Sequence, residues 1–204
     1  MSSARRAAHN NALGAQRERT RIAQTAARLI AEHGIADWTL AKRKAARQLL
    51  LPENASLPSN EEIEQALADH HALFGGDAHE VMLRRQRAEA LAWMRRLAAW
   101  EPLLVGGVAA GWATEHSDVR IELAADDSKA VEIALASSGQ AYAALPPNGD
   151  DAATHLRIDS SRIPVRLSIV TPAQRRNRPR KSEEPRLTAD AVASLISETS
   201  ADHG

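Results

Sequence analysis

Apolar residues recur at helical spacing along the first hundred residues of the chain. The first helical face is formed by four residues at positions i, i+4, i+7 and i+8: Ile22, Ala26, Leu29 and Ile30. This face predicts a helix over residues 16–33, and Gly34 can end it in the left-handed conformation. We expect residues 1–15, which precede this helix, to form a flexible basic arm.

Three more helices are predicted before residue 101. They cover residues 38–50, 59–74 and 77–99. Ser59 and Glu62 have the spacing of a capping box at the start of the third. The expected buried positions on the third and fourth helices are Ile63, Leu67, His70, Phe74, Val81, Ala88, Leu91, Met94 and Leu97. Residues 16–100 are therefore predicted to form one helical domain.

The pattern changes after residue 100 to short runs rich in β-forming residues. These runs cover residues 103–105, 119–124, 141–145, 155–159 and 165–171, and one helix is predicted over 127–138. The fold class is therefore α+β, with a small mixed β-sheet domain over residues 101–171. A charged tail over 172–204, with a short helix near its end at 189–197, is expected to follow.

Composition narrows the possible sites and locations. The chain of 204 residues contains no cysteine, which excludes disulfides and thiolate metal sites and fits a cytoplasmic protein. No apolar run approaches the roughly 20 residues that span a bilayer, so a membrane partner is not expected. Aromatic residues make up 3% of the chain, which predicts a core of aliphatic side chains.

Charges are segregated along the chain although the net charge is zero. Residues 1–50 carry ten basic and three acidic side chains, whereas residues 51–80 carry seven acidic and none basic. A basic run near the C-terminus is a candidate contact for a polyanion: Arg175, Arg176, Arg178, Arg180 and Lys181. It lacks interleaved aromatics, so it could contact phosphates but not stack on bases. Alternatively, the basic and acidic blocks pair with one another or face solvent.

One segment carries a specific motif. Residues 104–123 read LVGGVAAGWATEHSDVRIEL, an apolar strand, a glycine pair, and a second strand that begins with Ser117-Asp118. This segment resembles the signature of the nucleotidyltransferase superfamily in its minimal, polymerase-beta-like form. The resemblance implies that Gly106, Gly107 and Ser117 lie at nucleotide phosphates and that Asp118 is a catalytic ligand of Mg²⁺.

The chain departs from that signature at three positions. Gly107 stands where the family has serine, Arg120 replaces the second carboxylate, and Arg166 occupies the place expected for the third. A guanidinium is always charged and cannot bind a cation. Glu122 does not replace the missing acid, because four strand residues place its Cα about 13 Å from that of Asp118. We therefore expect a degenerate member without a metal cofactor.

Arginine recognises phosphate with a planar fork of donors, so Arg120 and Arg166 beside the glycine pair predict a nucleotide- or phosphate-binding site. The expected function is binding of a nucleotide, another phosphate-bearing ligand or RNA without catalysis. The alternative is a purely structural role, in which both arginines only form ion pairs with Asp118, Glu122 or Asp159 across the sheet.

Two other functions stay open. An active metal-dependent nucleotidyltransferase would use Asp118 and a further acid such as Asp159, with Mg²⁺ as cofactor. Alternatively, the chain is a helical regulatory, DNA-binding or interaction protein with a protein partner. Residues 21–34 resemble the opening helix of TetR-type repressors, but the segment after Gly34 lacks the expected recognition helix with its aromatic end.

Overall fold

The structure is a computed structural model that describes residues 2–35, 37–52, 54–146, 153–159, 163–177 and 185–201. The chain divides into two compact units. The helical unit comprises the residues up to Gly76 together with Thr114–His116, and the sheet unit comprises Asp77–Ala113 and the chain from Ser117 onward. Each unit is described by itself.

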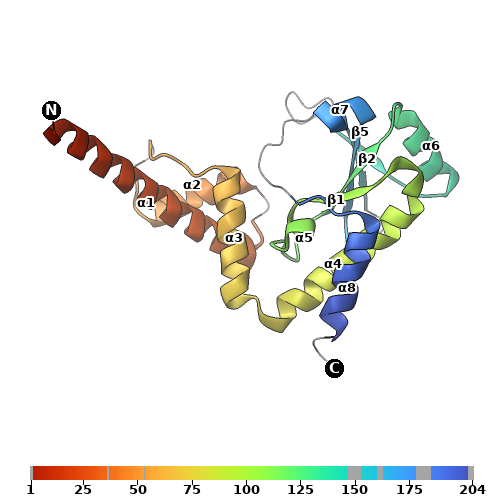
Figure 1. The fold of residues 1–204 in the computed structure, drawn as a ribbon, viewed down its shortest axis with the longest axis horizontal. Coiled ribbons are helices and arrows are strands. Elements are labelled where there is room, and N and C mark those ends of the chain that lie inside the picture. Colours follow the sequence, from red (N-terminus) through yellow and green to blue (C-terminus); the bar gives the residue numbers. More distant parts are fainter. Residues whose placement is uncertain are drawn as a thin grey trace. The chain divides into compact units, whose positions relative to one another are not determined.

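Three helices form the helical unit: α1 (Ser2–His33), α2 (Trp38–Gln48) and α3 (Asn60–Phe74) (Figure 1). The carboxylate of Asp37 caps α2 by accepting hydrogen bonds from the backbone N–H groups of Thr39 and Leu40. The predicted capping box at Ser59 and Glu62 is confirmed. Residues 2–15, for which the sequence suggested a flexible arm, belong to α1, since this stretch is rich in alanine and other strong helix formers.

The core of the helical unit lies where α1 packs on α2 and α3. The predicted face of α1 is confirmed, and small alanines let the helix backbones approach closely. The fully buried side chains of this three-helix core include Ile22, Ala26, Ala27, Ala41, Ala45, Ile63 and Leu67. The predicted face of α3 fails at its C-terminal end, where His70 is half-buried and Phe74 is 73% exposed.

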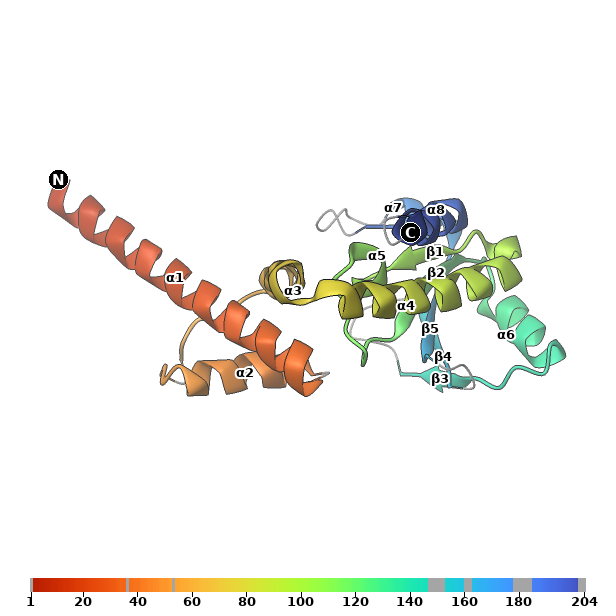
Figure 2. The same cartoon turned by 90° about the horizontal axis from the view of Figure 1, so that it is seen from below.

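The sheet unit is built on one mixed five-stranded sheet in the order β1-β2-β5-β4-β3 (Figure 2). The strands are β1 (Leu103–Val105), β2 (Val119–Ala124), β3 (Ala143–Leu145), β4 (Thr154–Ile158) and β5 (Val165–Val170). The pair β2 and β5 is parallel, and every other pair is antiparallel. The parallel pair is joined by a crossover that contains α6 (Ser128–Ser137), followed by β3 and β4. The α+β class predicted from the sequence is confirmed.

Helix α4 (Gly76–Arg96) belongs to the sheet unit, so the boundary expected at residue 100 is wrong. Its buried face includes Leu83, Trp93 and Met94, which share one core with strand residues such as Ile121 and Leu167. The predicted inner face was partly wrong, since Val81 is 55% exposed and Ala88 is also exposed. Helical periodicity shows that a helix has a buried side but not which other element covers it.

The charged tail contains more regular structure than predicted. Helix α7 (Pro172–Asn177) follows β5 directly, and α8 (Ala189–Ala201) lies beside β1 (Figure 2). Leu187 forms a two-way backbone hydrogen-bonded bridge with Leu104 at the β1 edge of the sheet. No helix among the described residues is both long and apolar enough to cross a membrane.

The end of α2 stores backbone strain that a substitution can release. Leu50 has φ = 55° and is 92% exposed, while Leu50 and Leu51 donate backbone hydrogen bonds to Arg47 and Ala46. The left-handed conformation costs a non-glycine residue about 1–2 kcal/mol, and glycine removes this cost. Glycine also loses more conformational entropy on folding, which offsets about 0.5–1 kcal/mol of the gain. We expect Leu50→Gly to raise the free energy of unfolding by about 0.5–1 kcal/mol in urea titrations.

The control for this prediction is Leu50→Ala, which removes the exposed side chain but keeps a Cβ in the left-handed conformation. It should give no such gain. Equal stabilisation by both substitutions would contradict the strain argument.

Candidate functional site

The glycine motif occupies the turn between β1 and the short helix α5 (Gly107–Ala110). Strands β1 and β2 are antiparallel neighbours, so the strand-turn-helix-strand arrangement predicted for residues 104–123 is confirmed. Gly106 has φ = 71°, and a Cβ placed there would lie 3.2 Å from Cδ of Arg120. The side chain of Arg120 therefore lies against the glycine turn, and the positive φ favours glycine at position 106.

Trp112 explains why position 107 is glycine. A Cβ at Gly107 would lie 2.7 Å from two carbons of the Trp112 ring, closer than a Cβ can approach. From α4, Arg87 donates to the carbonyl of Val108 at 3.3 Å, and a ring nitrogen of His79 lies 2.9 Å from the carbonyl oxygen of Gly111. Burial lowers the pKa of Arg87. The glycine turn is thus held by an indole ring and by two side chains of α4.

Three arginines form a row across the centre of the sheet. Arg120 of β2 is in register with Arg166 of β5, which is in register with Arg157 of β4. Directly opposed residues share a face, and neighbouring strands lie about 4.8 Å apart, so the three Cα atoms span about 10 Å. Arg120 is exposed, and the side chains of Arg157 and Arg166 are 38% and 39% exposed. We call these three residues the arginine row.

Two members of the arginine row pair with carboxylates. Arg166 lies 3.1 Å from Asp118, and Arg157 lies 2.7 Å from Asp159. The hydrogen bond to Asp159, with the negative charges of Asp118 and Asp159, raises the pKa of Arg157. Within the described part of the chain Arg120 has no hydrogen bond or ion pair. The row and its two acids therefore carry a net charge of +1, from three guanidiniums and two carboxylates.

The donor set does not fit a two-metal clamp. The second and third carboxylate positions implied by the resemblance are Arg120 and Arg166, which lie side by side on β2 and β5. Asp118 is already bound by Arg166, and Asp159 by Arg157. Among the described residues no three His, Asp or Glu side chains come together. Arginine offers no lone pair to a cation, so these residues favour an anion at this place.

Ser117 lies directly before Asp118, half-buried in the segment that leads into β2. Like Gly106, Gly107, Asp118, Arg120 and Arg166, it was predicted as a site residue. Through β1, β2 and β5, the fold places these residues around the glycine turn and the neighbouring strand pair.

Arg175 lies inside the sheet unit and not on a polyanion-binding surface. Its side chain is 15% exposed and lies 3.1 Å from the carboxylate of Glu122, which is itself 2% exposed. Arg186 binds the same carboxylate at 3.2 Å, and Arg175 also donates to the carbonyl of Glu101 at 2.8 Å. The polyanion role predicted for Arg175 does not fit this burial.

The rest of the C-terminal basic run is placed only in part. Arg176 is exposed on α7. Arg178, Arg180 and Lys181 lie outside the described residues. Their proposed contact with a polyanion stays a prediction.

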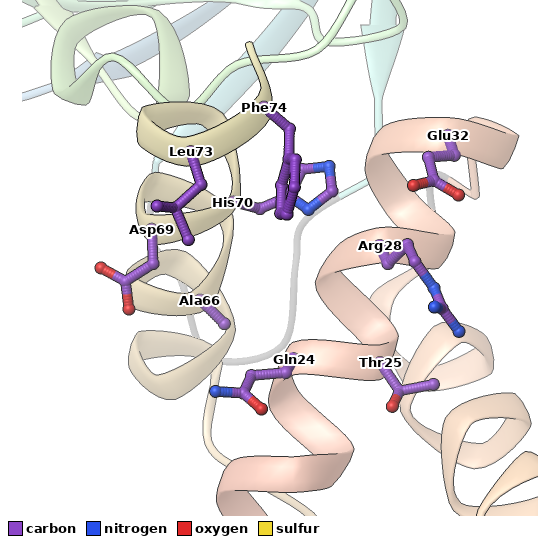
Figure 3. A pocket seen from close by; sticks show the side chains of 9 residues that line it. All are labelled: Gln24, Thr25, Arg28, Glu32, Ala66, Asp69, His70, Leu73 and Phe74. Atoms are coloured by element: carbon purple, nitrogen blue, oxygen red, sulfur yellow. The ribbon is translucent and has the colours of Figure 1, made fainter.

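A hollow of about 540 Å³ lies between α1 and α3 in the helical unit (Figure 3). The rings of His70 and Phe74 lie against each other there, with centroids 5.1 Å apart. The carboxylate of Asp69 and the guanidinium of Arg28 are directed to opposite sides (Figure 3). The polar groups around this hollow do not converge on one point, whereas the arginine row places three guanidiniums side by side. The arginine row is therefore the better candidate for a ligand site.

Sequence reasoning missed Arg157, Arg186 and Trp112 as parts of these arrangements. The alternation of His155, Arg157 and Asp159 along the predicted strand is a signal that could have placed Arg157 on a polar face. That Arg157 would lie opposite Arg166 could not be predicted from the sequence, because strand order and register are set by tertiary packing.

Comparison of the chain with models of known protein families, with curated proteins and with solved structures finds no match. The geometry of the described residues therefore carries the functional argument.

The buried ion pairs of Glu122 yield a stability prediction. Glu122→Gln would leave Arg175 and Arg186 without their shared counter-charge, and breaking a buried pair costs about 3–5 kcal/mol. Because Arg186 is one-third exposed, we expect the lower end, a loss of about 3 kcal/mol in the free energy of unfolding. Thermal or urea unfolding of the full chain measures it.

Glu101→Gln is the matched control, because Glu101 faces the same Arg175 at 3.8 Å but is 84% exposed. It should change stability by no more than about 0.5 kcal/mol. The double variant Glu122→Leu with Arg175→Met should recover part of the loss. Similar effects of the two glutamate substitutions would show that burial does not control the energy of this cluster.

Proposed function

We propose that the sheet unit binds a phosphate-bearing ligand, such as a nucleotide, on the arginine row beside the glycine turn, without metal-dependent nucleotidyl transfer. The observation that carries this proposal is the in-register placement of Arg120, Arg166 and Arg157 on the exposed part of one sheet face. The resemblance of residues 104–123 to the nucleotidyltransferase signature supports the same site for the phosphates.

Electrostatics supports an anion at this row. Like charges directly opposite each other in a sheet are destabilising, and here three guanidiniums are adjacent. Asp118 and Asp159 offset two of them, and Arg120 has no carboxylate partner in the described part of the chain. A phosphate group at Arg120 would supply the missing counter-charge and accept its fork of donors.

The glycine turn supports phosphate in preference to a bulkier anion. Gly106 lets the guanidinium of Arg120 lie against the turn, because a Cβ there would be 3.3 Å from its Nη1. A small phosphate bound by that guanidinium would therefore lie beside the turn. A polyphosphate chain can extend from this turn along the row toward Arg166 and Arg157, since the three Cα atoms span about 10 Å. An isolated inorganic phosphate would contact only part of the row.

Asp118 has a different role here from that of a metal ligand. Its carboxylate neutralises Arg166 in the ligand-free protein, so it competes with an incoming phosphate for the same guanidinium. Removing its charge should therefore strengthen phosphate binding. In a metal-dependent enzyme the same change would weaken nucleotide binding and turnover, since the carboxylate would hold Mg²⁺ against the phosphates.

The test is isothermal titration of the full chain with inorganic triphosphate, ATP and adenosine in the presence of EDTA. Triphosphate and ATP should bind with similar affinity, and adenosine should not bind. Arg120→Ala should weaken binding of both by about 10- to 100-fold, the equivalent of a charge-assisted hydrogen bond of about 1.5–3 kcal/mol. Asp118→Asn should tighten both by up to about tenfold.

Arg85→Ala is the matched control, because Arg85 is an exposed arginine of α4 in the same unit. It should leave the affinities unchanged. Binding that needs Mg²⁺ and is lost in Asp118→Asn would overturn the proposal in favour of a metal-dependent enzyme. Equal binding of adenosine, or no binding of triphosphate, would refute the phosphate site itself.

A further inference from the structure

Every exposed charged residue of α2 is basic, and its other exposed residues are Thr39, Leu40 and Gln48. Its exposed charged residues are Arg43, Lys44 and Arg47, and the helix contains no acidic residue. At 3.6 residues per turn these three side chains fall within an arc of about 100°, opposite the buried Ala41 and Ala45. They form one face, which also includes the exposed Leu40 and which we call the α2 basic face.

No carboxylate in the described ranges pairs with the α2 basic face. None of its three cations forms an ion pair or side-chain hydrogen bond within the described parts of the chain. Lys42, by contrast, turns toward α3, where its ammonium donates to Asn60 at 2.8 Å and burial lowers its pKa. Arg43 and Arg47 also border an open groove of about 530 Å³ beside the segment that follows α2. The charges are accessible to a partner.

From this charge distribution we infer that the α2 basic face docks on the phosphate backbone of duplex DNA. All charged groups of this face are cations, so its electrostatic complement is a row of phosphates. A single α-helix fits the wide major groove of B-form DNA, whereas the deep, narrow major groove of duplex RNA does not admit it. Binders of single strands use aromatic side chains for base stacking, and the exposed arc from Arg43 to Lys44 has none.

The mode of contact follows from where the cations lie. The N-terminal turn of α2 is capped by the carboxylate of Asp37, which disfavours a phosphate or an acceptor base edge at that end. The three cations lie in the middle and last turns. Binding is therefore electrostatic, independent of sequence and strongly dependent on salt.

The experiment is fluorescence anisotropy of a labelled DNA duplex of arbitrary sequence with the full chain, at several salt concentrations. The slope of log affinity against log salt should be at least about 2–3 in magnitude, since each neutralised phosphate adds about 0.9. The triple variant Arg43→Ala, Lys44→Ala and Arg47→Ala should lose tenfold or more in affinity, and its slope should fall by about 2–3.

The matched control removes three exposed cations from helices of the sheet unit: Arg85→Ala, Arg95→Ala and Lys129→Ala. It has the same net charge as the α2 variant but should keep DNA affinity and salt slope. Melting curves should show both triple variants folded, because exposed surface substitutions change stability by about 0.5 kcal/mol or less each.

Failure of this inference is distinct from failure of the phosphate site in the sheet unit. The α2 variant should retain triphosphate binding, and Arg120→Ala should retain DNA binding. Equal loss in the control variant, an unchanged salt slope, or tighter binding of a duplex RNA of the same sequence would overturn the assignment. So would absence of DNA binding by the unaltered chain at low salt.

Discussion

A single buried carboxylate, that of Glu122, links three separate parts of the sheet unit. Glu122 lies in β2, Arg175 reaches it from α7, and Arg186 reaches it from the segment that precedes the Leu187 bridge to β1. A carboxylate that is 2% exposed needs such partners, because an unpaired charge at that depth is costly. The same pairs fix α7 and the C-terminal segment on the sheet and keep Arg175 from any external anion.

The alternation of β2 and β5 separates the apolar core from a polar face. Val119, Ile121 and Leu123 are fully buried, while Arg120 between them is exposed and is opposed by Arg166 on the neighbouring strand. Farther along this polar face Glu122 is buried under Arg175. One sheet face therefore has a closed end, where arginines neutralise an acid, and an open end, where arginines outnumber acids. The proposed phosphate site is the open end.

The two units separate two kinds of positive charge. In the sheet unit, guanidiniums are fixed by strand register and in part by Asp118 and Asp159, which suits recognition of a compact ligand. On α2 the cations project from a helix without carboxylate partners in the described ranges, which suits an extended polyanion. The zero net charge of the whole chain conceals both features.

The sequence by itself determined most of the local structure. Hydrophobic periodicity located α2, α3, α4, α6, α8 and the five strands to within a few residues, but it missed α7 and the N-terminal half of α1. The spacing of Ser59 and Glu62 predicted a capping box that the structure contains. The glycine motif placed a turn and a short helix between two neighbouring strands. These features depend on residues close together in the chain, so local spacing is enough to predict them.

Only the tertiary structure decided which distant residues meet. It assigned α4 to the sheet unit and placed Arg157 beside Arg166. It also paired Arg175 and Arg186 with Glu122 and placed the Trp112 ring against Gly107. Each of these outcomes depends on strand order, register or the side of a helix that is covered. Such choices are made by the packing of the whole core, and a shift of one residue in register would exchange the two faces of the sheet.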